Sequence, residues 1–298
     1  TFTKIFVIKL NSGNIGHTSA LYIWNGLCVF WGTSFNTNPH RHNTLQLVFD
    51  IEKEFLLKDE NIEWTSYSAA IIDANHNHQL DSNGSIQLFL YLDKESRYAK
   101  LLKNKYLLKQ EMNSLAQVRI GRLNDNFFKQ LLVQNNCEEM FLGCISILRK
   151  LLDFSKQEEL DKRVEKAIDF ITKSSLKDFR VKDIALEVGL SESRLRHLFK
   201  ERVGQSIQNF IMWMRVIDSL NDVLKGKKLA ETAYEYGFSD ASHMTKSFIE
   251  IIGVPPSKIK TYEKQTKIIT CHNKNYFSLT TTVISDCNDN QIIKEIKI

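Results

Sequence analysis

Two stretches of sequence decide the fold: residues 184–204, IALEVGLSESRLRHLFKERVG, and residues 232–253, TAYEYGFSDASHMTKSFIEIIG. They are two copies of one pattern, in which Gly189 of the first copy corresponds to Gly237 of the second. In each copy a short segment with an apolar stripe precedes the glycine, and a longer segment containing a phenylalanine follows it. An internal repeat of this kind indicates two copies of the same supersecondary unit.

The first copy predicts two short helices joined by a turn. The leading helix has an apolar stripe at helical spacing, formed by Val181, Ile184, Ala185 and Val188. Gly189 ends that helix, because glycine adopts left-handed backbone geometry without steric cost, and Ser191 is a good N-cap for the next helix. The second helix buries Leu195, Leu198 and Phe199 and leaves polar and basic side chains outside, as contact with a DNA major groove requires.

The second copy follows the same plan with other residues. Its first helix has a face of small residues, Gly237 ends that helix, and Ser239 is expected to cap the next one. Between the copies lies a predicted amphipathic helix that would fix their separation, with apolar side chains at Ile207, Phe210, Ile211, Met214 and Ile217. We expect the two outer helices, 191–202 and 239–251, to present their polar sides together to one flank of a DNA duplex.

On these residues the chain resembles the AraC/XylS family of bacterial transcription regulators. The resemblance covers Val164–Thr261 and includes the motifs Val188-Gly189-Leu190-Ser191, Gly237-Phe238-Ser239-Asp240 and Gly253-Val254-Pro255-Pro256-Ser257. It implies that the two outer helices enter successive major grooves. By position, the family's base-contacting residues correspond to Ser193, Arg196, His197, Ser242 and Lys246. Arg196 is the strongest candidate, because a guanidinium can pair with both O6 and N7 of guanine.

The expected phosphate contacts come from the basic residues Lys200, Arg202, Lys225, Lys227 and Lys228. Three positions depart from the family pattern. Thr232 stands where an apolar residue is usual, and Ile249 and Glu250 stand where polar or basic residues are usual. We therefore expect the second unit to hold DNA less firmly than the first.

The first hundred residues are predicted to be rich in β-strands. Short runs of β-branched and aromatic residues, separated by turn formers, occur at Ile5–Leu10, Leu21–Phe30, Leu45–Ile51, Ala69–Ile72 and Ile86–Leu92. Together with the repeat they predict an α+β protein, with an N-terminal β-barrel or sandwich and a C-terminal all-α domain containing two helix-turn-helix units. The expected boundaries are a sensor domain at 1–100, a helical linker at 101–160, a DNA-binding domain at 161–264, and a tail of no assigned role at 265–298.

The segments Pro39–Leu47 and Ala74–Leu80 resemble the histidine-bearing strands of a cupin barrel. Metal-binding cupins have three histidines and one carboxylate, and the corresponding residues here are His40, His42, Gln46 and His78. Because a neutral amide is a poorer ligand for divalent iron or manganese than a carboxylate, we expect no metal and no other cofactor. The alternatives are a metal site, or histidines that line the mouth of the barrel and contact a small ligand.

Composition places the protein among soluble globular chains. The 298 residues are 43% hydrophobic and 25% charged, and no apolar stretch is long enough to span a bilayer or has the form of a secretory signal. The net charge is +5, and the span 161–264 contributes nineteen basic against fifteen acidic residues. Five scattered cysteines argue against a disulfide framework and for a reducing, cytoplasmic location.

The sequence therefore predicts a cytoplasmic regulator of transcription and no enzyme, since it contains no nucleophile triad, paired-carboxylate site or phosphate-binding glycine loop. Its expected partners are double-stranded DNA and an unidentified small-molecule effector, with RNA polymerase and a second copy of the chain as further candidates and no membrane. The helices of 101–152 either dimerise or only pack on the sensor. Two rival hypotheses are a metal-dependent cupin enzyme and an adaptor whose basic helices bind an acidic protein.

Overall fold

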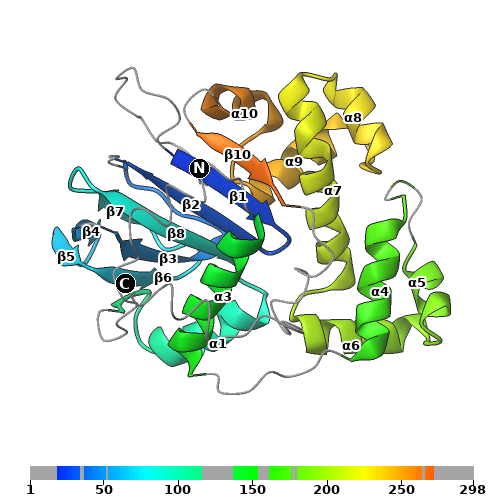
Figure 1. Cartoon of the computed structure of the whole chain (residues 1–298), viewed down its shortest axis with the longest axis horizontal. Coiled ribbons are helices and arrows are strands. Elements are labelled where there is room, and N and C mark those ends of the chain that lie inside the picture. The colour runs from blue at the N-terminus through cyan, green and yellow to red at the C-terminus, as the bar shows by residue number, and fades with distance from the viewer. Residues whose placement is uncertain are drawn as a thin grey trace.

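The computed structural model describes residues 19–271, apart from 34–36, 52, 116–136, 154–160, 176, 178–179 and 264–265. Within these residues, strands occupy the N-terminal part and helices the C-terminal part, as the α+β prediction requires (Figure 1). The predicted strand Ile5–Leu10 and the β-like run Tyr276–Ile284 lie outside the described residues.

The N-terminal part contains two sheets. The larger has seven strands in the order β10 (Lys267–Thr270), β1 (Ser19–Trp24), β2 (Leu27–Thr33), β8 (Ile86–Asp93), β3 (Thr44–Asp50), β6 (Ala69–Ile72) and β9 (Met112–Ser114). The smaller has three, in the order β5 (Thr65–Tyr67), β4 (Phe55–Asp59) and β7 (His78–Asp81). The strand predicted over Leu21–Phe30 is a hairpin, because Asn25-Gly26 forms a turn in which Gly26 has φ of 76°.

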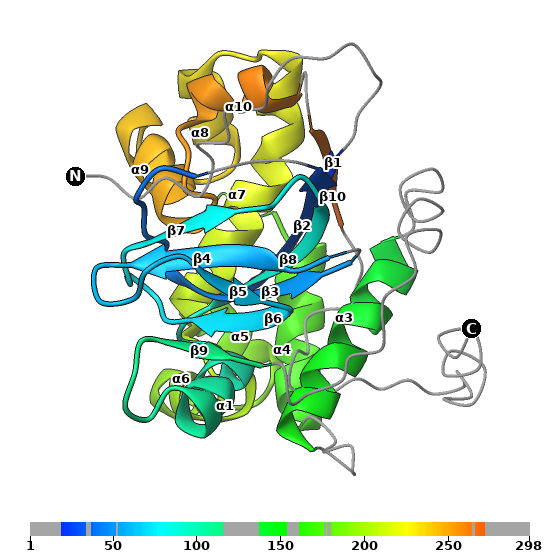
Figure 2. The same ribbon diagram turned by 90° about the vertical axis from the view of Figure 1, so that its left-hand side faces the viewer.

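Each face of the larger sheet is buried in its own apolar core. Leu45, Leu47 and Phe49 of β3 face a core shared with helices α1 (Arg97–Tyr106) and α3 (Cys137–Leu152), which cover the sheet in Figure 2. On the opposite face, Val48 and Phe89 share a core with residues of the smaller sheet. The near-continuous apolar character of these strands follows from burial on both faces.

The cupin-like barrel predicted from the sequence is not closed. In the described residues the seven-stranded and three-stranded sheets are separate, and they form an open, sandwich-like arrangement. β10 and β9 form the two edges of the larger sheet, and they do not pair with each other to close it. The sandwich that the spacing of the strands also allowed is the better description.

The C-terminal part is helical and has two halves. α4 (Lys162–Lys173), α5 (Val181–Glu187) and α6 (Glu192–Val203) share one core with the first half of α7 (Ile207–Lys225). α8 (Leu229–Glu235), α9 (Ala241–Ile251) and α10 (Pro256–Glu263) share a second core with the other half of α7. That second core is continuous with the core between the two sheets, so the helical part packs directly on the N-terminal domain.

The chain returns to the N-terminal domain after α10. β10 lies parallel to β1, with Leu21 opposite Ile268, and Cys271 is joined by a disulfide to Cys137 at the start of α3. The prediction of a chain without disulfides is therefore wrong. Cys28 and Cys144 are free and buried, and Cys287 lies outside the described residues. Among the described helices, none combines the length and apolar character needed to cross a membrane.

Candidate nucleic-acid interface

The first helix-turn-helix unit consists of α5 and α6. Ile184 and Ala185 of α5 are buried, and Gly189 adopts φ of 67° in the turn, where an added Cβ would meet nothing within 4 Å. The Ser191 side chain accepts a hydrogen bond from the Arg194 backbone N–H at 3.2 Å and so caps α6. These local features agree with those predicted from the sequence.

The second unit consists of α8 and α9. Gly237 has φ of 76° in the turn, and Met244, Phe248 and Ile251 are buried in α9. The predicted cap is wrong by one residue: Asp240, not Ser239, accepts a hydrogen bond from the His243 N–H, at 2.8 Å. The exposed carboxylate takes this position because its charge also interacts favourably with the positive end of the helix dipole, and the hydrogen bond lowers the pKa of Asp240.

The separation of the two units is fixed by α7. Its first half packs Ile207, Phe210 and Ile211 against the first unit, and its second half packs Val216 and Leu220 against the second. α7 is capped by Ser206, whose hydroxyl accepts from the Asn209 N–H at 3.1 Å, and it ends at Gly226 with φ of 82°. A helix of 19 residues with both sides buried is a stiff spacer.

The outward face of α6 is polar and basic. Ser193, His197, Lys200 and Arg202 are exposed and Arg196 is partly exposed. Arg196 lies 3.4 Å from Glu192 and Arg202 lies 3.4 Å from Glu201, and such exposed pairs are weak. These cations are therefore free to exchange their carboxylate partners for a more highly charged ligand.

The basic cluster at the end of α7, Lys225, Lys227 and Lys228, is only partly available to contact DNA phosphates. Lys227 forms ion pairs with both Asp222 and Glu235, which raise its pKa and hold its ammonium group against the protein. Lys228 lies 3.7 Å from Glu231, and Lys225 is exposed. Lys225 and Lys228 thus remain the better placed phosphate candidates of this cluster.

The polar face of α9 is turned toward the N-terminal domain. Its predicted base-contacting residues, Ser242 and Lys246, are exposed but line a cleft of about 630 Å³ whose opposite wall contains Asn43 and Asn75. The expectation that α6 and α9 present their polar sides together to one flank of DNA is therefore not met in this arrangement. α9 faces the sensor instead.

The three departures from the family pattern have structural explanations. Thr232 is fully buried, and its hydroxyl donates to the Lys228 carbonyl at 3.1 Å, so the helix itself satisfies the polar group. Ile249 and Glu250 line the cleft shared with the N-terminal domain. Two of the three departures, Ile249 and Glu250, are thus positions that face the N-terminal domain.

The two parts of the molecule are also joined by polar contacts at the start of α7. Asp93 at the end of β8 accepts hydrogen bonds from Asn209 and from the Trp213 indole, each at 2.9 Å. Asn25 in the β1–β2 turn donates to the Phe210 carbonyl and accepts from Gln205, each at 3.1 Å. No local sequence pattern marks these residues, because each pair is far apart in the chain.

The turn between α6 and α7 fits closely against α1. The Lys100 ammonium donates to the Gly204 carbonyl at 3.1 Å. Gly204 has φ of 88°, and a Cβ at this position would lie 2.4 Å from the Arg97 backbone nitrogen. Glycine is therefore required here both for the left-handed backbone and for close packing between domains.

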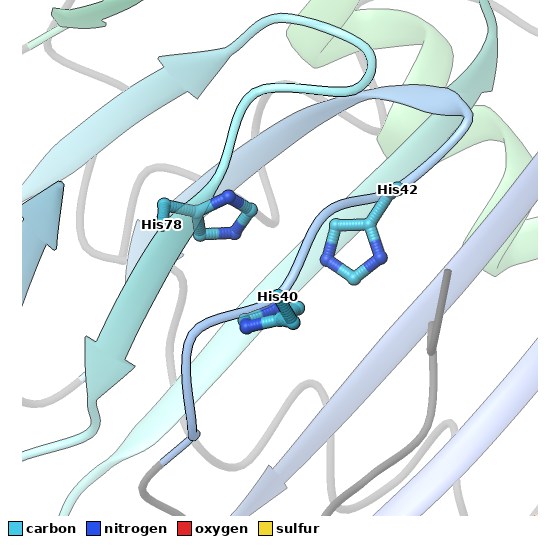
Figure 3. Close-up of side chains that lie close together, drawn as sticks. All are labelled: His40, His42 and His78. Atoms are coloured by element: carbon cyan, nitrogen blue, oxygen red, sulfur yellow. The ribbon is translucent and has the colours of Figure 1, made fainter. Parts of the chain in front are cut away.

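The histidines predicted from the cupin resemblance come together. His40 and His42 precede β3 and His78 begins β7, and their donor nitrogens lie within 4.8 Å of one another (Figure 3). The pKa of His42 is lowered well below its usual value and that of His78 to about 3. Burial is the largest cause of both pKa shifts, and the neighbouring imidazoles also lower both pKa values. All three imidazoles are therefore neutral at physiological pH.

Gln46, the fourth residue of the cupin-like set, is buried, as are two tryptophans of the N-terminal domain. Gln46 is 2% exposed and stands opposite Tyr91 in the β3–β8 register, and the Tyr91 ring lies 5.2 Å from that of His42. Trp24 and Trp31 are buried in the core, and Trp64 is exposed.

Two helix-turn-helix units held on one spacer helix define the class of the C-terminal domain. Residues 184–261 match the family model of a helix-turn-helix domain. The match confirms the helix-turn-helix character of the repeated motifs.

Curated relatives support the same class. Over 97 residues the chain is 31% identical to an uncharacterised HTH-type transcriptional regulator of Pseudoalteromonas carrageenovora, covering 33% of this chain and 58% of the relative. Over 162 residues it is 28% identical to the transcriptional regulatory protein HptR of Staphylococcus aureus, covering 54% of this chain and 61% of the relative. The chain thus spans about three-fifths of the length of these relatives.

Among solved structures, the chain is similar to ToxT of Vibrio cholerae. The sequence identity is 17%, the TM-score is 0.41, and the similarity covers 82% of this chain and 96% of that one. The matched model describes a helix-turn-helix domain, and both curated relatives are described as transcriptional regulators.

Proposed function

We propose that the protein is a sequence-specific DNA-binding transcription regulator. The observation that carries this proposal is the pair of helix-turn-helix units on α7, of which α6 exposes Ser193, His197 and Lys200 beside the partly exposed Arg196. In a helix-turn-helix protein the second helix of the unit lies in the major groove. The family match at 184–261 supports the same role.

The arrangement of α9 supports regulation by a change in domain position. A cleft of about 630 Å³ is too small to admit a DNA duplex, so Ser242 and Lys246 reach a major groove only after α9 moves away from Asn43 and Asn75. In this arrangement only the first unit would be free to contact bases. A ligand that favours one domain arrangement over the other would change DNA affinity.

The proposed effector site lies between the domains. Apolar side chains fill the space between the two sheets, including the fully buried Phe30, Phe55 and Phe89. A second cavity of about 310 Å³, by contrast, has polar walls from both domains, among them Asp93, Lys94, Lys200 and Asn209. Its size suits a small polar or charged molecule, and its occupant would contact both domains at once.

The direct test is selection of binding sites from random duplex DNA with the full chain, followed by affinity measurements at several salt concentrations. We expect affinity to fall steeply with salt, because bound Lys and Arg release counterions from phosphates. Arg196→Ala should reduce discrimination at one base pair by about 1–3 kcal/mol. Arg194→Ala is the matched control, since Arg194 lies about 200° away around the same helix and its loss should leave discrimination unchanged.

Two outcomes would contradict the proposal. One is selection that enriches no sequence, together with DNA affinity that does not change with salt concentration. The other is equal loss of discrimination in the Arg196→Ala and Arg194→Ala variants, which would place the base contacts elsewhere than on the predicted face of α6.

A further inference from the structure

Three imidazoles converge in the N-terminal domain at a distance from the helix-turn-helix units. His40 and His42 lie on the segment that enters β3, His78 begins β7, and their rings point toward a common space (Figure 3). The ring centroids are separated by 4.7 Å for His40 and His42, 4.4 Å for His40 and His78, and 5.3 Å for His42 and His78. Three imidazoles around one zinc ion, with nitrogens about 2.0–2.1 Å from the metal, have ring centroids about 5 Å apart.

Backbone carbonyls fix the protonation of two of these rings. His40 Nδ1 lies 2.8 Å from the Asn38 carbonyl oxygen, and His78 Nδ1 lies 3.1 Å from that of His76. A carbonyl oxygen only accepts, so Nδ1 carries the proton in each neutral ring and Nε2 keeps its lone pair. Histidines that bind metals usually donate their other N–H to a carbonyl or carboxylate in this way.

The lone pairs have no protein partner. In the part of the chain that the structure describes, His78 Nε2 and both ring nitrogens of His42 are buried without a hydrogen bond. His42 is 2% exposed and His78 is 1% exposed. An unsatisfied buried polar group costs about 1–3 kcal/mol, and a ligand that accepts electron pairs would satisfy these lone pairs.

The backbone holds the three residues in place without a ligand. His40 and His78 face one another in an antiparallel bridge, with N–H to carbonyl distances of 3.0 Å and 2.9 Å. The His42 carbonyl accepts from the Asn75 N–H. A site on such fixed positions loses little conformational entropy when it binds an ion.

We propose that His40, His42 and His78 bind one late first-row divalent cation, of the class that includes Zn²⁺, Ni²⁺ and Cu²⁺. The absence of metal expected from the sequence rested on Gln46, which replaces a carboxylate. Neutral imidazole ligands suit these late metals, whereas Mn²⁺ and Mg²⁺ prefer carboxylates. Gln46 therefore selects among metals and does not prevent binding. Its buried Oε1, which has no hydrogen-bond partner among the described residues, is available as a neutral fourth donor.

The test uses the full chain, stripped with a chelator, and titrates it calorimetrically with Zn²⁺ and spectroscopically with Co²⁺. We expect one equivalent of Zn²⁺ and a visible Co²⁺ spectrum of nitrogen ligation without thiolate bands. Removing a group that only supports a metal ligand weakens metal binding by up to about 100-fold. His40 is itself a proposed ligand, so His40→Ala should weaken Zn²⁺ binding at least about 100-fold. Because His40 is only partly buried, this variant is the least disruptive to folding. His243→Ala, a histidine of α9 outside the three-histidine cluster, is the control and should bind Zn²⁺ like the wild type.

A second variant tests the role assigned to Gln46. Gln46→Glu restores a carboxylate, so its affinity for Mn²⁺ should rise at least about tenfold over the wild type. Wild-type protein that binds no Zn²⁺, or a His40→Ala variant that binds it as tightly as wild type, would overturn the proposal. So would a Co²⁺ spectrum with thiolate bands, which would place the metal on cysteines. Since none of these measurements involves DNA, the result is independent of the proposed function.

Discussion

The carboxylate of Asp93, the last residue of β8, accepts a hydrogen bond from the indole Nε1 of Trp213 in α7 at 2.9 Å. The two residues lie 120 positions apart in the sequence, and the same carboxylate oxygen also accepts from Asn209. One oxygen atom of the N-terminal domain thus holds two side chains of the helix that separates the helix-turn-helix units. This contact links the N-terminal domain directly to α7.

Replacing that carboxylate should release the DNA-binding domain. In Asp93→Asn an amide group replaces the oxygen that accepts from Trp213 and Asn209, whereas the hydrogen bond from the Glu95 N–H to Oδ1 can be kept. Hydrogen bonds to charged groups contribute about 1.5–3 kcal/mol, so we expect DNA affinity to rise by up to about tenfold as the docked arrangement is depopulated. Fluorescence anisotropy of labelled DNA measures the change. Glu95→Gln is the control for loss of negative charge, and an equal rise in both variants would refute the explanation.

Gly204 and Gly189 provide a matched pair of substitutions. Both have positive φ, 88° and 67°, so alanine should cost each about 1–2 kcal/mol of backbone strain. Only at Gly204 would the new methyl group also collide with the Arg97 backbone. We therefore expect Gly204→Ala to lower the free energy of unfolding more than Gly189→Ala, and only Gly204→Ala to loosen the contact between domains. Urea denaturation and limited proteolysis between the domains measure the two effects; equal behaviour of the variants would show that the close approach is unimportant.

The cap of α6 should be measurable by a single substitution. Ser191→Ala removes the hydroxyl that accepts from the Arg194 N–H and should lower the free energy of unfolding by about 1 kcal/mol. Ser193→Ala, on the exposed face of the same helix, should change it by less than about 0.5 kcal/mol. Thermal or urea unfolding of the two variants decides the matter, and similar losses in both would show that the capping bond contributes nothing.

The disulfide between Cys137 and Cys271 should contribute to stability in the absence of reductant. Cys271→Ser should lower the free energy of unfolding by about 2–4 kcal/mol, because the cross-link restricts the unfolded chain. The Cys137→Ser and double variants should lose the same amount, since either cysteine alone leaves no bond. Dithiothreitol should reduce the wild-type value to that of the variants. Losses that add in the double variant would mean that the two cysteines are not paired.

Local signals made the helix-turn-helix units predictable. The turns at Gly189 and Gly237 and the cap at Ser191 depend on residues only a few positions apart, and all three were predicted. The cap of α9 was misplaced by one residue, because Ser239 and Asp240 are both good N-caps and the pattern does not choose between them. The hairpin at Asn25-Gly26 was missed, although this dipeptide is a common turn. Both flanking strands are buried on two faces, so they lack the alternation of apolar and polar residues. That alternation would have marked them as two separate strands.

Contacts between distant segments were not predictable. The bond between Asp93 and Trp213 and the disulfide depend on pairs separated by 120 and 134 residues. β10 is a four-residue strand at a sheet edge, and its pairing with β1 has no local signature. The grouping of His40, His42 and His78 was found only through the spacing shared with cupin strands. The closed barrel that this likeness also implied is absent from the described residues, since histidine spacing reports on two strands and not on sheet closure.

The disulfide and β10 have a mechanical consequence for the helices between them. The chain leaves the N-terminal domain at α3 and returns to it at β10, so residues 138–270 form a loop whose two ends are covalently locked together on the same body. A domain on one tether can swing in any direction, but a domain anchored at both ends pivots mainly about the axis through its anchors. Reduction of that bond would remove the covalent anchor at one end, so the helical domain could move with less restriction.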